Sequence, residues 1–418
     1  MEHRLKKAII ILVSVIATVA LFALTGCAPG PAASPGAAAQ PTASGSQPAS
    51  SGSKSAASSS QPAAPSTASP VTIGLVTEVT GAQASTGDNQ TNGIKMAMDE
   101  INQKGGIKGQ QVKLVIEDDA STPAGTVTAF NKLMSGQKPT AVFISNFANF
   151  DMAIEPAIKT AAIPAITGAS GPDVTAAGNP WIFRVRTNDN IMGRLAAEYA
   201  VKDMGAKKPA ILYVTGDMGA GASKIVAENL KSLGVPPVDV ESYNPNDKDV
   251  TAQLLNMQKA GADLVIGWGY PPDAAMVMTS MKQLGVKMKL LGSPAYAVSD
   301  ALKLAGSAAD GVTTITDWVA SDDPAVQAWA KKMEARAHLP ANFIHSVYYD
   351  GMNILAQTIE KVGTDPTAIR DGLRAVKDYK GITGVYSFDK NGDGLRQAYI
   401  AQIKDGKPVM IKSIKADQ

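Results

Sequence analysis

The sequence has few of the side chains on which catalysis and metal binding most often depend. It contains one cysteine, Cys27, and three histidines in 418 residues. One thiol cannot form a disulfide within the chain, so the fold has to be stabilised by its hydrophobic core alone. Of the histidines, His3 lies in the N-terminal segment, and neither His338 nor His345 stands in an HExxH arrangement. The sequence therefore predicts no metal site and no histidine-based catalytic triad.

The sequence also lacks an excess of charge of either sign. The formal net charge is +2. Residues 1–26 contain three basic side chains and one acid, so the rest of the chain has equal numbers of both. Without a basic excess there is no field to attract phosphate backbones, and no nucleic-acid partner is expected. Beyond the N-terminal segment no stretch is long and apolar enough to span a bilayer.

The N-terminal segment itself has the pattern of an export signal. Three basic residues within the first seven precede an apolar run, Ala8–Leu24, which ends in Leu-Thr-Gly-Cys at residues 24–27. This ending resembles the bacterial lipobox, which implies that residues 1–26 are removed and that Cys27 carries lipid. A signal with a chance cysteine or an uncleaved anchor is the alternative, although the run is shorter than the ~20 residues of a membrane span. We expect an extracytoplasmic protein that is tethered to a membrane.

A low-complexity segment follows the cysteine. Residues 28–70 consist of Ala, Ser, Pro, Gly, Gln and Thr, apart from the single charge of Lys54. Such a segment cannot bury enough apolar surface to offset its ordering entropy. Residues 27–70 are therefore interpreted as a lipidated cysteine and a disordered linker.

From Val71 on, short β-branched or apolar runs alternate with segments of helical period. The expected strands are Val71–Thr77, Val112–Glu117, Thr140–Ser145, Ala161–Thr167, Pro209–Thr215, Pro237–Tyr243, Asp263–Gly267, Lys287–Gly292 and Val312–Asp317. Alternation of strand and helix predicts an α/β fold in which helices cover both faces of a parallel sheet. Two blocks, roughly 71–180 and 205–317, predict two α/β lobes.

A polar segment near the C-terminus, Asp389–Gly394, matches the first half of a calcium-binding EF-hand loop. The twelfth position of such a loop needs a bidentate glutamate, and here it is Ile400. We interpret the segment as a turn in which asparagine and glycine take left-handed backbone. Residues 384–388 and 397–404 are expected to pair as a hairpin around it.

Six stretches resemble one known family. They are VTIGLVTEVTG at 71–81, NGIKMAMDEINQKGGIKGQQVKLVIEDDAS at 92–121, AIEPAIKTAAIPAIT at 153–167, WIFRVRTND at 181–189, YYDGMNILAQTIEKVG at 348–363 and GVYSFDKNGDG at 384–394. They resemble the solute-binding proteins of ABC importers of the branched-chain amino-acid (Leu/Ile/Val) type. The resemblance implies the type I periplasmic binding fold, with two Rossmann-like lobes and a hinge of three crossovers. The implied parts are 71–188 with 320–388 for lobe 1, 189–319 with 389–418 for lobe 2, and crossovers near 187–190, 317–321 and 386–394.

The same resemblance implies a ligand site between the lobes. The positions it gives here are Gln83, Thr86, Ala148, Asn149, Gly168, Ala169, Ser170, Met218, Tyr270, Tyr296 and Phe343. In amino-acid binders of the family a serine after the third strand holds the ligand carboxylate, and Ala148 and Asn149 stand there instead. Ser170, after the fourth strand, keeps a hydroxyl. An acid that pairs with the ligand ammonium would fall in residues 292–296, which contain none.

These departures predict a small polar solute, a carboxylate or amide, that is not recognised through an ammonium at residues 292–296. Glu78, Asp217 or Asp273 could hold an ammonium from another direction, so an ordinary amino acid is the alternative. The partners implied are an ABC permease with its ATPase and, through Cys27, membrane lipid. A sensory receptor of the same fold is a second possibility. An exported enzyme is a third, but no catalytic residue and no cofactor are predicted.

Overall fold

The computed structural model describes residues 69–416 except residue 246. The expected export signal, Cys27 and nearly all of the linker to residue 70 lie outside the described residues. None of the helices in the described part of the chain has both the length and the apolar character needed to cross a membrane.

The first part of the described chain forms a five-stranded parallel sheet in the order β2-β1-β3-β4-β5. Its strands are β1 (Val71–Thr77), β2 (Val112–Asp118), β3 (Ala141–Phe143), β4 (Ala165–Thr167) and β5 (Ile182–Arg184). The central strands β1, β3 and β4 are almost wholly buried, as expected where helices cover both faces. The helices between the strands are α1 (Ala84–Gln103), α2 (Pro123–Gly136), α3 (Ala148–Ala161) and α4 (Asp173–Ala176).

A second, seven-stranded sheet has the order β14-β13-β10-β9-β8-β6-β7. Its strands are β6 (Pro209–Val214), β7 (Asp239–Tyr243), β8 (Leu264–Trp268), β9 (Lys289–Gly292), β10 (Thr313–Thr316), β13 (Gln397–Lys404) and β14 (Lys407–Lys415). β13 runs antiparallel to both β10 and β14, whereas the other pairs are parallel. The helices of this part are α5 (Asp189–Lys202), α6 (Asp217–Ser232), α7 (Thr251–Lys259), α8 (Pro271–Leu284), α9 (Ser299–Ala305) and the short 3₁₀ helices η1 (Pro294–Ala297) and η2 (Gly306–Ala308).

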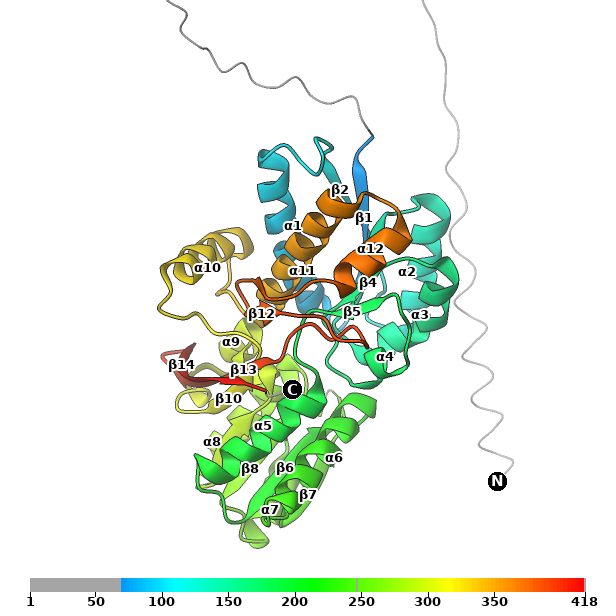
Figure 1. The fold of residues 1–418 in the computed structure, drawn as a ribbon. Helices are drawn as coiled ribbons and strands as arrows, with labels where there is room; N and C mark the ends of the chain where they lie inside the picture. The colour runs from blue at the N-terminus through cyan, green and yellow to red at the C-terminus, as the bar shows by residue number, and fades with distance from the viewer. Residues whose placement is uncertain (1–68, 246, 417–418) are drawn as a thin grey trace, which may run out of the picture. The chain divides into compact units, whose positions relative to one another are not determined.

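After β10 the chain returns to the first sheet (Figure 1). The returning elements are α10 (Pro324–Ala337), α11 (Phe343–Val362), α12 (Pro366–Arg374) and a two-stranded sheet of β11 (Tyr379–Lys380) and β12 (Val385–Tyr386). α11 packs along α1, where Gly93 allows the close approach: a Cβ at this glycine would lie 2.5 Å from the carbonyl oxygen of His345. The chain then enters the second sheet again at β13, so it passes between the two sheets three times.

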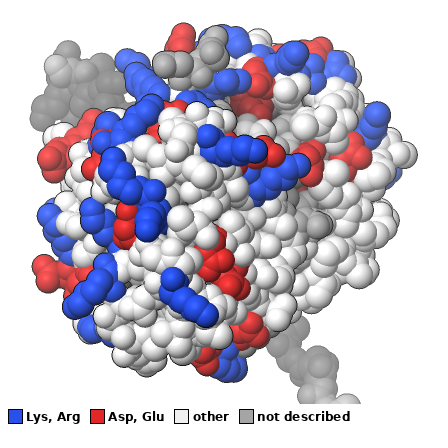
Figure 2. All heavy atoms as spheres, turned by 90° about the horizontal axis from the view of Figure 1, so that it is seen from below, with Lys and Arg blue, Asp and Glu red and all other residues white. Residues whose placement is uncertain are grey.

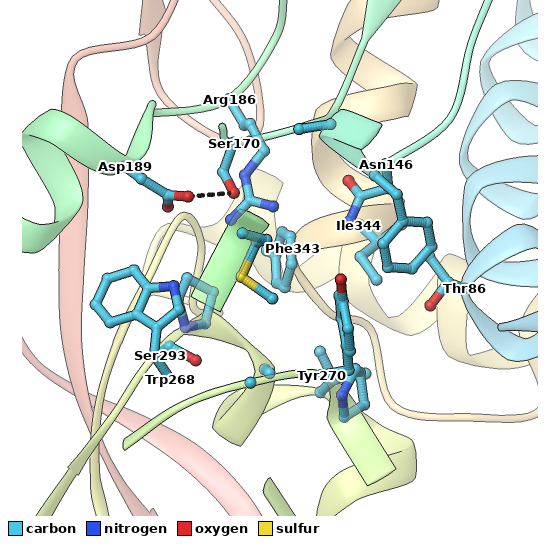
Figure 3. Close-up of a pocket in the computed structure, with 18 of the residues that line it drawn as sticks. Thr86, Asn146, Ser170, Arg186, Asp189, Trp268, Tyr270, Ser293, Phe343 and Ile344 are labelled. Atoms are coloured by element: carbon cyan, nitrogen blue, oxygen red, sulfur yellow. Dashed lines mark hydrogen bonds between the residues drawn. The ribbon is translucent and has the colours of Figure 1, made fainter. Parts of the chain in front are cut away.

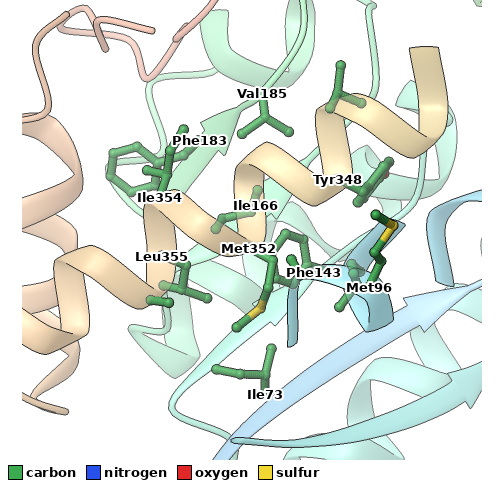
Figure 4. Close-up of a cluster of buried hydrophobic side chains, with 14 of the residues drawn as sticks. Ile73, Met96, Phe143, Ile166, Phe183, Val185, Tyr348, Met352, Ile354 and Leu355 are labelled. Carbon is green, nitrogen blue, oxygen red and sulfur yellow. The ribbon is translucent and has the colours of Figure 1, made fainter. Parts of the chain in front are cut away.

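The core of the first sheet forms where α11 covers it. Figure 4 shows Met352 and Leu355 of α11 facing Phe143 and Ile166 of the strands. All four side chains are buried. Each such side chain stabilises the fold by about 1.5–3 kcal/mol relative to an exposed one. Distant segments of the sequence therefore depend on one another for this core.

The α/β fold class is confirmed, and each of the nine expected strands is present with ends shifted by up to four residues. Three strands, β5, β11 and β14, were not predicted. The predicted C-terminal hairpin is present only as one antiparallel bridge, Tyr386–Leu395, beside the turn, whereas β12 pairs with β11, and β13 pairs with β10 and β14. The turn at Asp389–Gly394 does form: Asp389 Oδ1 accepts hydrogen bonds from the N–H groups of Asn391 and Asp393. Gly392 is left-handed with a φ of 93°, whereas the expected left-handed backbone at Asn391 is not found.

Charges of both signs are spread over the surface. Figure 2 shows basic and acidic side chains interspersed on one face, with uncharged stretches between them. This face has no field of a single sign to attract a polyanion.

Candidate ligand-binding site

A cavity lies at the carboxyl ends of strands from both sheets, the place where open α/β sheets bind ligands. Its lining comes from the loops after β3, β4, β5, β8 and β9 and from the first turns of α1, α6 and α11. The residues are Thr86, Asn146, Phe147, Ala148, Ser170, Gly171, Arg186, Asp189, Met218, Trp268, Gly269, Tyr270, Pro271, Ser293, Pro294, Ala295, Val298, Phe343 and Ile344. The cavity volume is about 60 Å³, and a single water needs about 10–15 Å³. The space suits a small solute.

Two charged side chains of opposite sign lie in the cavity wall (Figure 3). Arg186 is 5% exposed; its Nη2 lies 2.6 Å from Oδ2 of Asp317, and its guanidinium stacks 4.5 Å from the ring centroid of Phe343. Asp189 is 3% exposed and accepts a hydrogen bond of 3.0 Å from Ser170 Oγ. Burial raises the pKa of Asp189, against the opposing effects of Arg186 and of the Ser170 hydroxyl.

Several polar atoms of the wall have no hydrogen-bond partner among the described residues. They are Asn146 Oδ1, Ser293 Oγ and Arg186 Nε. Buried polar atoms in native proteins are nearly always paired, because an unpaired one costs about 1–3 kcal/mol. An acceptor, a hydroxyl and a guanidinium N–H left unpaired around one cavity indicate a place for a polar ligand or for water.

The remainder of the wall is apolar. Phe147 and Tyr270 meet edge to face with ring centroids 5.3 Å apart. Met218, Trp268 and Ile344 complete this side. An apolar wall with a few convergent polar groups is the usual composition of a small-molecule site.

Comparison with known proteins agrees with this geometry. A family model described as periplasmic binding protein matches residues 70–408. The chain belongs to the periplasmic binding protein family. A Pseudomonas aeruginosa relative, described as a leucine-, isoleucine-, valine-, threonine- and alanine-binding protein, is 27% identical over 327 residues, which cover 78% of this chain and 87% of the relative. The resemblance to the Leu/Ile/Val-binding proteins is thereby confirmed.

Solved structures show the same fold. The branched-chain amino acid transporter substrate binding protein of Streptococcus pneumoniae, in complex with isoleucine, has a TM-score of 0.77 at 23% identity, over 83% of this chain and 100% of that one. A solute binding protein of an ABC transporter from Rhodopseudomonas palustris, in complex with 3,4-dihydroxybenzoic acid, has a TM-score of 0.76 at 22% identity, over 84% and 98%. Both likenesses establish the type I periplasmic binding fold.

The cavity of this periplasmic binding protein contains about half of the residues expected from the sequence. Thr86, Ala148, Ser170, Met218, Tyr270 and Phe343 line it, whereas Gln83, Asn149, Gly168, Ala169 and Tyr296 do not. Trp268, which is not among these expected positions, also lines it.

The five expected residues outside the wall have other places. Gln83 precedes α1 and donates its N–H to Ser121, and Asn149 is exposed on α3. The N–H groups of Gly168 and Ala169 already donate to Tyr348 and Thr167. Both amides are therefore already paired within the protein.

Tyr296 belongs to the core. It is fully buried against β8 and β9, where Gly267 and Gly292 leave room for its ring. A Cβ at Gly292 would lie 2.2 Å from Cγ of Tyr296, so the ring fills the space that a side chain would take.

The acids proposed from the sequence are not those in the cavity. Glu78 lies behind the wall, and Asp273 accepts a hydrogen bond from the N–H of Tyr270 at the start of α8. The side chain of Asp217 is outside the described residues. The sequence analysis missed Arg186 and Asp189, although two charged residues directly after a buried strand at a predicted crossover were a usable signal. Within the described ranges no group of three or more His, Cys, Asp or Glu could hold a metal ion.

Proposed function

We propose that this protein captures one small amino-acid-like solute in the cavity and delivers it to the permease of an ABC importer. The observation that carries the proposal is the carboxylate of Asp189. Arg186 pairs with Asp317, and Arg184 pairs with Asp393 at 3.3 Å. Among the described residues Asp189 has no ion-pair partner, and the Ser170 hydroxyl is its side-chain hydrogen-bond donor. Arg186 and Arg184 act on this carboxylate from a distance, and a buried carboxylate that makes no ion pair favours a ligand that brings a positive charge.

The remaining polar groups fit the other end of such a ligand. Asn146 Oδ1 can accept a hydrogen bond from an ammonium, and Ser293 Oγ and Arg186 Nε can donate to a carboxylate. The apolar wall at Phe147 and Met218 would take the side chain. The sequence favoured a carboxylate or amide not recognised through an ammonium at residues 292–296, with an ordinary amino acid as the alternative. This proposal favours that alternative, with Asp189 as an acid that lies outside residues 292–296.

The proposal is tested by identifying what the purified protein carries. The protein is denatured, and the released small molecules are identified by mass spectrometry. We expect a compound with both an amino and a carboxyl group. An acid without an ammonium, such as a benzoate, would contradict the proposal.

We also propose that the lobes are residues 71–188 with 320–388 and residues 189–319 with 389–418, and that they close on the ligand about the three connections. Two sheets that share one cavity support this division. Small-angle scattering with and without ligand would test closure.

A lipid anchor at Cys27 outside the cytoplasm remains a proposal from the sequence motif at residues 24–27. Cys27→Ala is expected to release the protein from the membrane fraction. Membrane attachment equal to that of the parent would contradict it. At least two acyl chains are expected on the anchor, because one gives only marginal attachment.

A further inference from the structure

Behind the cavity wall lies a group of buried acids that do not line the cavity. Glu78 follows β1, and Asp151 lies on α3. Both are fully buried, and neither lines the cavity. Buried carboxyls are costly unless they make hydrogen bonds, so their partners show what they do.

The first acid holds a hydroxyl. Ser145 Oγ makes a short hydrogen bond to Glu78 Oε1, and Gln90 Nε2 donates to Oε2 at 2.7 Å. Ser145 Oγ in turn accepts the N–H of Phe147 at 3.0 Å. Glu78 therefore fixes the hydroxyl whose oxygen holds the backbone of Phe147, a residue of the cavity wall.

The second acid repeats this arrangement on the next strand. Thr167 Oγ1 makes a short hydrogen bond to Asp151 Oδ2 and accepts the N–H of Ala169 at 2.8 Å. Ala169 directly precedes Ser170, which contacts Asp189. The other carboxyl oxygen of Asp151 has no partner, so the bond to Thr167 is its one side-chain anchor among the described residues.

We propose that Glu78 and Asp151 are positioning residues of the ligand site, which act through Ser145 and Thr167 on two of the loops that form its wall. The loops are 145–148 and 168–171. Each acid fixes the direction of a hydroxyl, and each hydroxyl fixes one backbone amide at the turn. The loops then present Asn146 and Ser170 to the cavity. The effect on ligand binding rests on the proposed function, whereas the positioning of the two loops by these hydrogen bonds does not.

The protonation of this group supplies a readout. Burial, and next the charge of Asp119, raise the pKa of Glu78 to about 8. Burial also raises the pKa of Asp151, with a further rise from Glu78. The charged and titratable groups that face the two acids are Asp119 after β2, Arg184 on β5 and Tyr348 on α11. At neutral pH Glu78 is mostly protonated, and its ionisation above pH 8 places a charge beside two other acids.

The test is backbone amide exchange of the ligand-free purified chain, followed residue by residue by NMR between pH 6 and 9. In the parent, protection of the Phe147 amide, corrected for intrinsic exchange, is expected to fall as pH rises through about 8. Ser145→Ala should lower protection at Phe147 about tenfold and leave Ala169 unchanged, and Thr167→Val should do the reverse. Glu78→Gln keeps a neutral side chain of the same shape, so it should retain protection and lose the pH dependence.

Ser135→Ala, at an exposed position of α2, is the matched control and should leave the protection of both amides unchanged. Equal protection of Phe147 in the parent and in Ser145→Ala would overturn the proposal. So would a pH dependence that persists in Glu78→Gln. Because no ligand is added, these results stand whether or not the protein binds an amino acid. Calorimetry with L-leucine then reports on the site: if the parent binds it, Ser145→Ala should bind it more weakly, and Ser135→Ala should bind it like the parent.

Discussion

At the scale of single residues, the charge of the ligand that the cavity accepts depends on which of its charged side chains already have an ion-pair partner. Arg186 is neutralised by Asp317, so it leaves no unmatched positive charge in the wall, and its guanidinium can still donate a hydrogen bond to a ligand. Asp189 lacks such a partner and is nearly buried. A ligand ammonium beside it would offset the cost of holding this carboxylate away from water.

Asp189→Asn should therefore weaken the binding of L-leucine by at least about 30-fold, since loss of one partner of a buried charge pair costs about 2 kcal/mol or more. The affinity of the parent should also fall as pH falls, because the raised pKa of Asp189 lets it take up a proton earlier than an ordinary aspartate. Calorimetry across pH measures both effects. Asp173→Asn, at an exposed position of α4, is the control and should bind like the parent. Unchanged affinity in Asp189→Asn would show that the ammonium lies elsewhere.

At the scale of elements, α1 and α11 depend on a backbone contact that leaves no room for a side chain. A Cβ at Gly93 would also lie 3.2 Å from the carbonyl carbon of His345, on a helix that is itself buried. A rigid backbone atom cannot move aside as a flexible side chain can.

Gly93→Ala is expected to lower the free energy of unfolding by about 1–3 kcal/mol. Gly221→Ala, within α6 and with open space at its Cβ, should raise it by about 0.4–1 kcal/mol, because alanine favours the helix. Urea unfolding monitored by circular dichroism measures both. The packing account is wrong if the two variants shift the midpoint in the same direction.

The elements also show how far sequence reasoning reaches. The strands of both sheets were predictable, because buried β-branched runs between helices are typical of parallel sheets. β5 and β11 were missed because they have three and two residues, and β14 because it is an edge strand on which the apolar Val409 and Ile411 are exposed. The hairpin was predicted too long because the turn residues do not reveal that β13 pairs with β10, a strand far away in the sequence.

The site was predictable to a similar extent. Thr86, Ser170 and Phe343 follow from the family pattern and line the cavity. Arg186 and Asp189 were missed because their direction depends on how the chain leaves β5. Gly168 and Ala169 were expected in the cavity and do not line it; the acceptors of their amides come from α11 and from a hydroxyl that the sequence does not place.

At the scale of the whole molecule, buried ion pairs tie the connections between the sheets together. Arg186 leaves β5 and meets Asp317 after β10, which also accepts the N–H of Thr187 at 3.0 Å. The Thr187 hydroxyl donates to the carbonyl oxygen of Gln397 at the start of β13. All three connections therefore meet in one hydrogen-bonded group.

Asp317→Asn should destabilise the protein by about 3–5 kcal/mol, because it leaves the Arg186 charge buried and unpaired. Asp203→Asn, which removes the exposed pair with Lys412, should change stability by less than about 1 kcal/mol. Thermal unfolding compares the two variants. Similar small effects would mean that the connections are held by other contacts.

The buried acids also predict how stability depends on pH. Burial raises the pKa of Glu78 to about 8 and those of Asp119 and Asp350 to about 6, so the stability they contribute at low pH is lost as pH rises through these values. Burial lowers the pKa of His345 to about 3, so its contribution is lost as pH falls below about 6.5. Between pH 6.5 and 8 we assign the decline to Glu78.

Glu78→Gln should therefore flatten the fall in unfolding free energy between pH 6.5 and 8, by up to about 1.4 kcal/mol per pH unit. Urea unfolding at a series of pH values gives the slope. A slope equal to that of the parent would mean that Glu78 does not titrate in this range.

The most direct test of the account is one calorimetric comparison on the purified protein. L-leucine and 4-methylpentanoate differ at the α-amino group and share the carboxylate and the branched side chain. We expect L-leucine to bind with a 1:1 stoichiometry. 4-Methylpentanoate should bind at least about 30-fold more weakly, because it leaves Asp189 without a positive partner. Equal or tighter binding of 4-methylpentanoate would contradict it.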